Sequence, residues 1–545
     1  MASSILDIGK TALNAAQVGM SVTGHNIANA ATPGYTRQVV IQGTALAQNF
    51  GYGYVGQGTR VLDIQRVYNE ILAKQVNNSL SSSNEMSAYA TQMRYIDNLL
   101  SNANAGLAPA IQNFFTSIHT AAANPGDPAS RQTMLSQAQS MAARFQALGS
   151  RLAEIEGDVN TLVTASIGRI NSYSQQLQQL NISIEAALNN GVGAPNDLLD
   201  QRDQLIAELS KQIKVDVTEQ QDGTYNVFIG NGQPLVVGKT RYTLTTMRSE
   251  SDPTRLEVGY NGNSGPVLLN SNSLSGGELG GLLQFREKSL DVVRGQLGVI
   301  ALTLAETFNA QHMLGYDKSG NAGGTFFSVP GPVVSGNVSN SGDAVLDVTI
   351  NSAGALNGSN YRLAYDGTNY ILTRLDNGST QTFASLPQVV DGLEIAISSG
   401  SMQPSDSFLI KPAIAAANGF AVAIGNIDEI ALAELPSAGN GDNGNALKLA
   451  ALQTALTTAG GTTSYEGAYG QLVSLVGNRT NELNIMSEAE AAMLEGAYNA
   501  QQAYSGVNLD EEAANLIRYQ QAYQAASKMM QIASQLFELL LTIGH

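Results

Sequence analysis

Apolar residues recur at helical spacing at both ends of this chain. Near the N-terminus, Leu6, Leu13, Met20 and Ile27 lie seven residues apart. Near the C-terminus a similar stripe, interrupted at Glu512, is formed by Leu509, Leu516, Tyr519, Tyr523, Met530 and Phe537. A seven-residue repeat is typical of the narrow seam of a coiled coil rather than the broader apolar face of a globular helix. We therefore expect a helix at each end and predict that both stripes pack between subunits.

The N-terminal helix is expected to end in the stretch "HNIANAATPGYTRQVV", residues 25–40. Pro33 disfavours helical geometry in the residue before it, and Pro33-Gly34 suits the centre of a type II turn. Asn26 and Asn29 lie three residues apart, where their amides can satisfy carbonyls of the ending helix or of a neighbour. We predict a helix end, a turn and the start of a strand, with these four residues as the turn motif.

Helical patterns also dominate the segments on either side of the middle of the chain. We expect helices from about residue 67 to 123, with breaks at "SLSSSN" (79–84) and "NANAGLAP" (102–109). Beyond the turn and helix N-cap in "NPGDPAS", one apolar stripe runs to about Asn189, with a single irregular step at Ser166. A helix of this length spans on the order of 90 Å, so the molecule should be elongated.

The periodicity then changes to the two-residue alternation of strands. "VDVTEQQDGTYNVFIGNGQPLVVG" alternates about Asp222-Gly223, which predicts a β-hairpin in a strand-rich region near 213–270. A helix is expected at "LGGLLQFREKSLDVVRGQLGVIALTLAETFNAQH". Residues 324–412 are rich in Gly, Ser, Asn and Val with turn signals, and helices resume after "GNGDNGN".

These patterns predict an α+β, multidomain and elongated fold. It has paired, coiled-coil-like N- and C-terminal helices, a long helical bundle as its middle domain and an inserted β-rich outer domain. The predicted inner domain pairs residues 1–60 with 495–545. The mostly helical domain combines 61–323 with 413–494, and the outer domain covers 324–412.

Composition narrows the possible partners. The 545 residues carry 28 Lys and Arg against 45 Asp and Glu, so the net charge of −17 argues against nucleic acid or an anionic membrane surface as partner. The absence of Cys excludes disulfides, thiol nucleophiles and Cys-ligated metals. The start "MASSILDIGK" lacks a basic region followed by an apolar run, so we expect no cleaved signal peptide.

Candidate chemistry is sparse. "GYGYVG" (51–56) matches the dinucleotide fingerprint, but an extended pattern follows it where that site needs a helix, so we expect a Gly/Tyr loop. Of the four histidines, His119 on an apolar helix face and His312 near a helix end are assigned buried or capping roles. We predict no catalytic, cofactor or metal site.

Two stretches resemble known proteins. "HNIANAATPGYTRQ" resembles the N-terminal signature of the axial proteins of the bacterial flagellum, which are rod, hook and hook-associated proteins. "SGVNLDEEAANLIRYQQAYQAASKMMQIASQLFELLL" is similar to the ending of the flagellar hook-associated protein 1 family. Internal stretches such as "NDLLDQRDQLIAELS" also resemble that family. The likeness covers both termini and the helical framework, and fades between about 324 and 412.

The resemblance implies a structural protein without enzymatic activity or cofactor. It implies export in an unfolded state through the flagellar channel, and polymerisation by the terminal helices into a ring at the hook–filament junction. The implied partners are further copies of the chain, the hook protein, the neighbouring hook-associated protein 3 and an export chaperone. The stripes described above would then be axial assembly contacts. Two alternatives stay open: another axial protein such as the hook subunit, or a secreted enzyme or adhesin that carries its activity on the β-rich insert.

Overall fold

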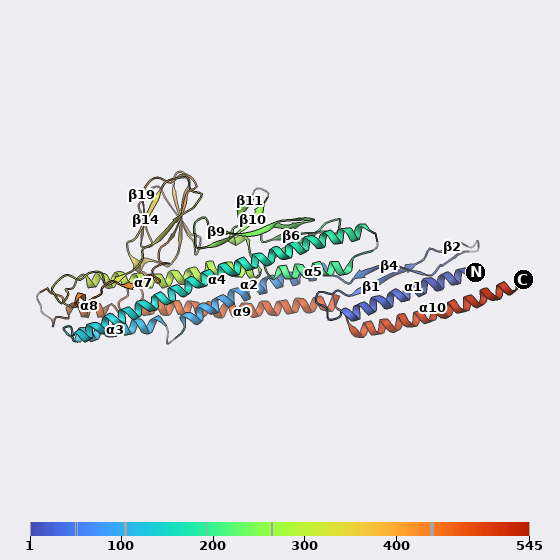
Figure 1. The fold of residues 1–545 in the computed structure, drawn as a ribbon, viewed down its shortest axis with the longest axis horizontal. Helices are drawn as coiled ribbons and strands as arrows, with labels where there is room; N and C mark the ends of the chain where they lie inside the picture. The colour runs from blue at the N-terminus through green and yellow to red at the C-terminus, as the bar shows by residue number, and fades with distance from the viewer. Residues whose placement is uncertain are drawn as a thin grey trace.

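The computed structural model describes residues 2–543 apart from 50, 52, 103–105, 192, 263–264 and 437–440. The molecule is elongated, with long helices along its length, a β-rich lobe standing on one side and both termini at one end (Figure 1). The predicted fold class, an elongated α+β chain with paired terminal helices, is confirmed.

The terminal helices lie side by side beyond the end of the helical body. Helix α1 (Ala2–Asn29) runs toward the body, and helix α10 (Leu509–Ile543) runs back from it, so the pair is antiparallel (Figure 1). Strands β1 (Gln38–Thr44) and β4 (Thr59–Arg66) form an antiparallel ribbon that packs along α1. The short strands β2 (Gln48–Asn49) and β3 (Tyr54–Val55) pair at its far end.

The helical body is built around helix α4 (Pro128–Asn189), which has 62 residues. Asp127 caps it by accepting hydrogen bonds from the amides of Ala129 and Ser130, and Pro128 occupies the first turn, where no amide hydrogen is needed. The other helices of the body are α2 (Glu70–Leu100), α3 (Leu107–Ala123), α5 (Asn196–Ser210), α6 (Gly277–Phe285), α7 (Asp291–His312), α8 (Gly444–Ala451) and α9 (Tyr465–Ser505). A π-helical turn (Arg286–Leu290) joins α6 to α7.

One predicted helix break is wrong and one is confirmed. Helix α2 continues through 79–84, because Leu80 is buried in a small cluster with Val76 and Ala497 of α9. Tertiary packing there overrides the weak helix propensity of the serine run. The break at 102–109 is confirmed, since α2 ends at Leu100 and α3 begins at Leu107.

The predicted hairpin is confirmed at β5 (Val215–Glu219) and β6 (Tyr225–Ile229). Gly223 has a φ of 77°, and Asp222 accepts a hydrogen bond from the amide of Thr224, which closes the turn. The sheet continues with β7 (Gln233–Val237) and β8 (Thr240–Arg241). A three-stranded sheet follows in the order β11 (Gly265–Leu268), β10 (Leu256–Gly262) and β9 (Thr243–Arg248).

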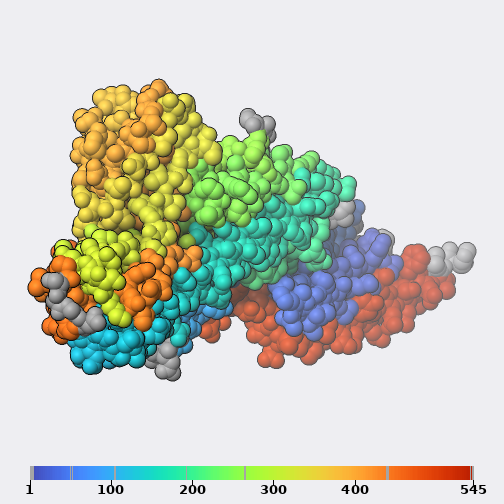
Figure 2. Space-filling view, turned by 60° about the vertical axis from the view of Figure 1, so that its left-hand side comes forward, coloured from blue at the N-terminus to red at the C-terminus, as the bar shows by residue number. Residues whose placement is uncertain are grey.

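The β-rich lobe holds two antiparallel sheets and projects from one side of the helical body, resting on α7 (Figures 1 and 2). The five-stranded sheet has the order β13 (Val333–Gly336), β20 (Ser407–Lys411), β15 (Tyr361–Tyr365), β16 (Tyr370–Arg374) and β17 (Thr380–Phe383). The three-stranded sheet has the order β14 (Val345–Ile350), β19 (Leu393–Ser399) and β18 (Gln388–Val390).

The lobe starts later than the limit predicted at residue 324. Strand β12 (Phe327–Ser328) pairs with β21 (Ala421–Val422) outside both sheets of the lobe. Phe326 and Phe327 are fully buried among aromatic side chains of the body, such as Phe114 and Phe308. These two residues therefore belong by packing to the helical body.

Candidate functional site at the anchor of the terminal helices

The seam between α1 and α10 is lined by small residues. A Cβ added to Gly9 would lie 2.7 Å from Sδ of Met530, and one added to Gly19 would lie 2.5 Å from the ring of Tyr519. Ala526 and Ala533 of α10 are buried beside them. The two helices approach this closely because glycine has no side chain to separate them.

The predicted apolar stripes mostly flank this seam instead of filling it. Leu6, Leu13, Met20 and Ile27 are half-buried. On α10, Tyr519 and Met530 are half-buried against α1 at the two glycines. The remaining four predicted contacts are exposed: Leu509 (55%), Leu516 (37%), Tyr523 (39%) and Phe537 (46%).

Glu512, the interruption of the apolar stripe, is the buried centre of an ionic cluster. It is 2% exposed and accepts hydrogen bonds from Nδ2 of Asn26 (3.1 Å) and Nε of Arg37 (2.8 Å). Arg37 also pairs with Glu511 at 2.9 Å, and its amide donates to the carbonyl of Ser505. This cluster ties the start of α10 to the stretch that follows α1.

Asn26 uses all four of its hydrogen-bonding positions. Its Nδ2 donates to the carbonyl of Gln38 (2.9 Å) and to Glu512, while its Oδ1 accepts from the Tyr35 hydroxyl (2.7 Å) and the Gln38 amide (3.0 Å). Burial raises the pKa of Tyr35, and the nearby carboxylates of Asp200, Asp197 and Glu512 raise it further. The hydroxyl therefore stays protonated and acts as a fixed donor.

The turn after α1 has the geometry that its residues favour. Asn29 donates from Nδ2 to the carbonyl of His25 (3.0 Å), which satisfies an end of the helix. The amide of Tyr35 donates to the carbonyl of Thr32 across Pro33-Gly34, and Gly34 has a φ of 77°. Proline fixes a negative φ at the first central residue, and with a positive φ at the second the turn is of type II.

Three carboxylates on one face of α5 anchor this turn to the body. Asp200 accepts from the Thr36 amide (3.0 Å) and from Arg66 (2.7 Å), which also donates to Asp203 (2.8 Å). Asp197 accepts from Gln38 (3.1 Å). Burial raises the pKa of Asp203, and the Arg66 and Arg202 guanidinium groups oppose that shift.

Sequence reasoning missed Glu512, Arg37, Arg66 and the α5 carboxylates. Two signals were available. Residues 510–512 place three acids in the first turn of a helix, where the helix dipole favours them. Residues 197, 200 and 203 repeat an acid every third position, which places the acids on one helix face.

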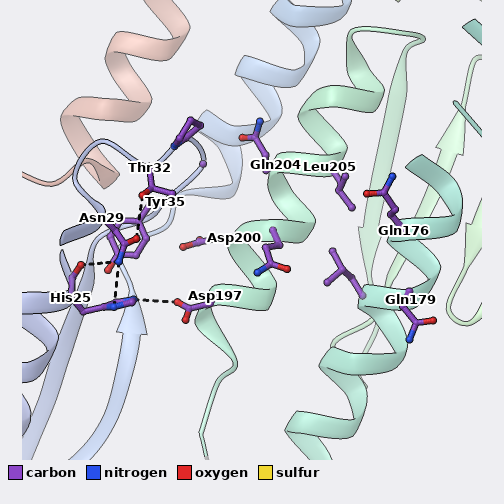
Figure 3. Close-up of a pocket in the computed structure, with 14 residues that line it drawn as sticks. His25, Asn29, Thr32, Tyr35, Gln176, Gln179, Asp197, Asp200, Gln204 and Leu205 are labelled. Atoms are coloured by element: carbon purple, nitrogen blue, oxygen red, sulfur yellow. Dashed lines mark hydrogen bonds and ion pairs between the residues drawn. The ribbon is translucent and has the colours of Figure 1, made fainter. Parts of the chain in front are cut away.

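A cleft of 650 Å³ lies between the turn and helices α4 and α5 (Figure 3). Amide side chains line much of it, including Asn29, Gln176, Gln179 and Gln204, and His25 approaches Asp197 at 3.5 Å across its edge. No group of His, Asp and Glu within the described ranges is placed to hold a metal ion.

The remaining sequence candidates are structural. Residues 51–56 lie at the β2–β3 hairpin, with Tyr52 outside the described residues, and strand β4 rather than a helix follows. His312 is buried: Nδ1 donates to the carbonyl of Gly324 (2.8 Å) and Nε2 accepts from the Ala431 amide (2.9 Å). The assignment of His119 to an apolar face is wrong, because that residue is exposed.

None of the described helices contains a stretch that is both long and apolar enough to span a lipid bilayer.

Comparisons with known proteins agree with this architecture from end to end. Residues 93–327 match the helical domain of the flagellar hook-associated protein FlgK, and residues 335–412 match the D2-like domain of flagellar hook-associated protein 1. The ends match models for flagellar basal body rod proteins, at residues 6–36 and 501–543. The chain is 37% identical to flagellar hook-associated protein 1 of Escherichia coli, over 99% of this chain and 100% of that protein.

The chain belongs to the flagellar hook-associated protein 1 family. It is 38% identical to the Salmonella typhimurium member, again over 99% and 100% of the two chains. The structure of the flagellar hook junction protein FlgK from Burkholderia pseudomallei superposes with a TM-score of 0.75 at 31% identity, covering 79% of this chain and all of that one. The chain is therefore a structural protein of the bacterial flagellum.

The match at 335–412 corrects one expectation from the sequence. The resemblance was expected to fade across 324–412, yet the D2-like domain model covers most of that stretch. The β-rich lobe is thus a regular domain of the hook-associated protein 1 family. The matches give no support to the alternative of an enzyme or adhesin activity carried on this lobe.

Proposed function

We propose that the chain forms the ring at the hook–filament junction and that its terminal helices build the axial part of that ring. The observation that carries this proposal is the apolar surface left exposed on the terminal pair. Its exposed large residues on α10 are Leu509, Leu516, Ile517, Tyr523, Ile532, Leu536, Phe537 and Leu539. Because small residues fill the seam within the chain, these large side chains remain for other subunits to cover.

The polar side of α1 fits the inner wall of such a tube. Asp7, Lys10, Asn14, Gln17 and Ser21 are exposed and recur every three or four residues, so they share one helix face. A polar face suits a water-filled channel. The turn at Pro33-Gly34 then redirects the chain from this inner helix toward the outer layers.

This role requires specific partners and a route out of the cell. Further copies of the chain complete the ring, the hook protein lies on one side, and hook-associated protein 3 lies on the other. An export chaperone keeps the apolar ends covered before secretion through the flagellar channel. A chain without Cys suits export in an unfolded state, because no disulfide can form within it.

The same geometry favours a structural role without enzymatic activity. The polar groups at the anchor are engaged with one another: Asn26 makes four hydrogen bonds, and Arg66 bridges Asp200 and Asp203. Groups held in this way fix a geometry and are not free to attack a substrate.

Adding the purified full-length chain to isolated hook fragments tests the proposal. Electron microscopy of the mixture should show added density at one end of each hook. A matched chain truncated after Ser505, which lacks α10, should leave the hook ends bare. Bare hook ends with the full-length chain would overturn the proposal.

A further inference from the structure

The terminal unit has two unlike faces on opposite sides of α1. Gly58, directly before β4 of the ribbon, lies against Ile8 and Thr11, and Gly9 and Gly19 lie against α10. At 3.6 residues per turn, Ile8 and Thr11 fall on one flank of the α10-facing side of α1. The stripe formed by Leu6, Leu13, Met20 and Ile27 falls on the other flank. The ribbon therefore packs on one side of α1, opposite the side that carries this stripe.

The exposed residues of α10 extend the side of α1 that carries this stripe. Because the helices are antiparallel, the flank of α10 that shares a side with the α1 stripe is the one that carries Leu509, Leu516 and Tyr523. All three are exposed, whereas the α1 stripe is half-buried. Together these seven residues form one apolar strip along the pair, which we term the open face.

The ribbon carries a second apolar surface on the other side of the unit. Leu62 is 52% exposed, Tyr54 is 76% exposed, and Ile41, Leu46 and Val55 are exposed as well. A two-stranded ribbon is marginally stable alone, and this one packs along α1 and is hydrogen-bonded to α5 at the end next to the body. The described part of the chain thus leaves these apolar side chains of the ribbon exposed.

We propose that the ribbon of one subunit packs on the open face of the next copy of the same chain. This inference rests on the proposed ring, and it names the surfaces that build it. Since the two surfaces differ and lie on opposite sides of one unit, their contact is head-to-tail. Contacts of that kind close into rings or continue as helices, whereas a contact between identical surfaces stops at a dimer.

Charge on the two surfaces supports a second copy as the occupant. Arg60 of the ribbon is exposed and forms no ion pair with any described residue. Glu538 is exposed, also has no ion-pair partner in the described part of the chain, and falls on the same flank of α10 as Leu516. A cation on one surface and a carboxylate beside the other favour their association.

Cysteine cross-linking tests this arrangement cleanly, because the chain contains no Cys. Leu62→Cys would be combined in turn with Leu509→Cys, Leu516→Cys or Tyr523→Cys. The displacement of neighbouring copies along the axis of the helix pair determines which of these residues lies opposite Leu62. Each double variant is assembled on hook fragments and oxidised with copper phenanthroline. At least one should give a ladder of covalent oligomers on non-reducing gels, because a disulfide forms only where the Cα atoms lie within about 7 Å.

The controls separate the possible contacts. Leu62→Cys with Gln524→Cys should give no ladder, since Gln524 lies next to Tyr523 in sequence but off the open face. Mixing the two single variants should give covalent dimers and nothing longer. Dimers from one single variant alone would overturn the head-to-tail contact. Normal assembly without cross-links from any combination would also overturn it, while the proposed junction function would stand. Failure of the unmodified chain to reach the hook would instead remove the proposed function.

Discussion

The helical body and the terminal helix pair differ in where their large apolar side chains lie. In the body, large aromatic side chains such as Phe114, Phe308 and Phe327 are fully buried against one another. In the terminal pair, Gly9 and Gly19 form the seam, and the large apolar residues lie outside it. Both regions consist of long antiparallel helices, so the difference between them lies in whether the large side chains are inside or outside the helix contact.

This contrast shows which region is complete as a single chain. A body that buries its aromatic residues gains most of its stability within the chain. The terminal pair is joined through polar groups at Asn26, Arg37 and Glu512, which fix its position without covering its apolar surface. Its stability therefore depends on neighbours, which suits a segment that must cross a channel before it assembles.

The largest expected effect comes from truncating the aromatic core of the body. Phe114→Ala should lower the free energy of unfolding by about 3–5 kcal/mol, because the lost contacts leave a cavity. Phe537→Ala, at an exposed position of α10, should change the stability of the free monomer by less than about 0.5 kcal/mol. Urea unfolding of both variants measures the difference, and similar losses would contradict the contrast.

The next effect concerns the ionic anchor of α10. Glu512→Ala should destabilise the docking of the terminal pair by about 2–3 kcal/mol, since it leaves Arg37 and Asn26 without their shared acceptor. Glu511→Ala removes a more exposed partner of the same arginine and should cost less than about 1 kcal/mol. Hydrogen exchange of the amides in α1 and α10 measures the loss of docking stability in both variants. Equal protection in the two variants would show that Glu512 is not the anchor.

A smaller effect is expected at the seam. Gly19→Ala should weaken the α1–α10 contact by about 1–2 kcal/mol, because the new methyl group meets the Tyr519 ring. Gly24→Ala on the same helix meets nothing within 4 Å and should leave the pair unchanged or slightly stabilise it. Limited proteolysis of the ends distinguishes the variants. Equal protease resistance of Gly19→Ala and the unmodified protein would mean that α1 and α10 lie further apart at Gly19 than in the structure.

The smallest effect is the contribution of His312 to the pH dependence of the stability of the body. Burial lowers the pKa of His312 below 6.5, although its hydrogen bond to Gly324 partly opposes the shift. The unfolded chain therefore binds more protons as the pH falls below about 6.5, and the body should lose stability there. This one group can change the free energy of unfolding by at most about 1.4 kcal/mol per pH unit. His312→Gln should flatten this pH dependence in urea titrations at pH 8, 6.5 and 5, and an unchanged slope would assign the dependence to other groups.

Sequence patterns were sufficient for features that depend on local periodicity or local turns. The 62-residue helix α4 follows from one long apolar stripe and the cap signal in "NPGDPAS", and the β5–β6 hairpin follows from Asp222-Gly223. Features set by distant partners were not accessible. The serine run in α2 stays helical because of Ala497, and Phe326 joins the body because of Phe114.

At the candidate site, too, local features could be predicted from the sequence and features set by distant partners could not. The turn at Pro33-Gly34 is local, so its residues indicated it. Glu512 was taken as an interruption in an apolar stripe, because its partners Asn26 and Arg37 lie at the other end of the sequence. A seven-residue stripe also does not indicate which side of it faces a partner in the same chain. That depends on Gly9 and Gly19, which the stripe does not include.

The most direct test of the central claim compares two neighbouring residues of α10. Tyr523 lies on the open face, and Gln524 lies one position further round the helix. In the free monomer Tyr523→Asp and Gln524→Asp should have the same helix content, since both positions are exposed. On hook fragments, electron microscopy should show hook ends bare with Tyr523→Asp and occupied with Gln524→Asp, because a carboxylate in an apolar interface is costly to bury. Equal occupancy by the two variants would contradict the claim that this face joins the subunits.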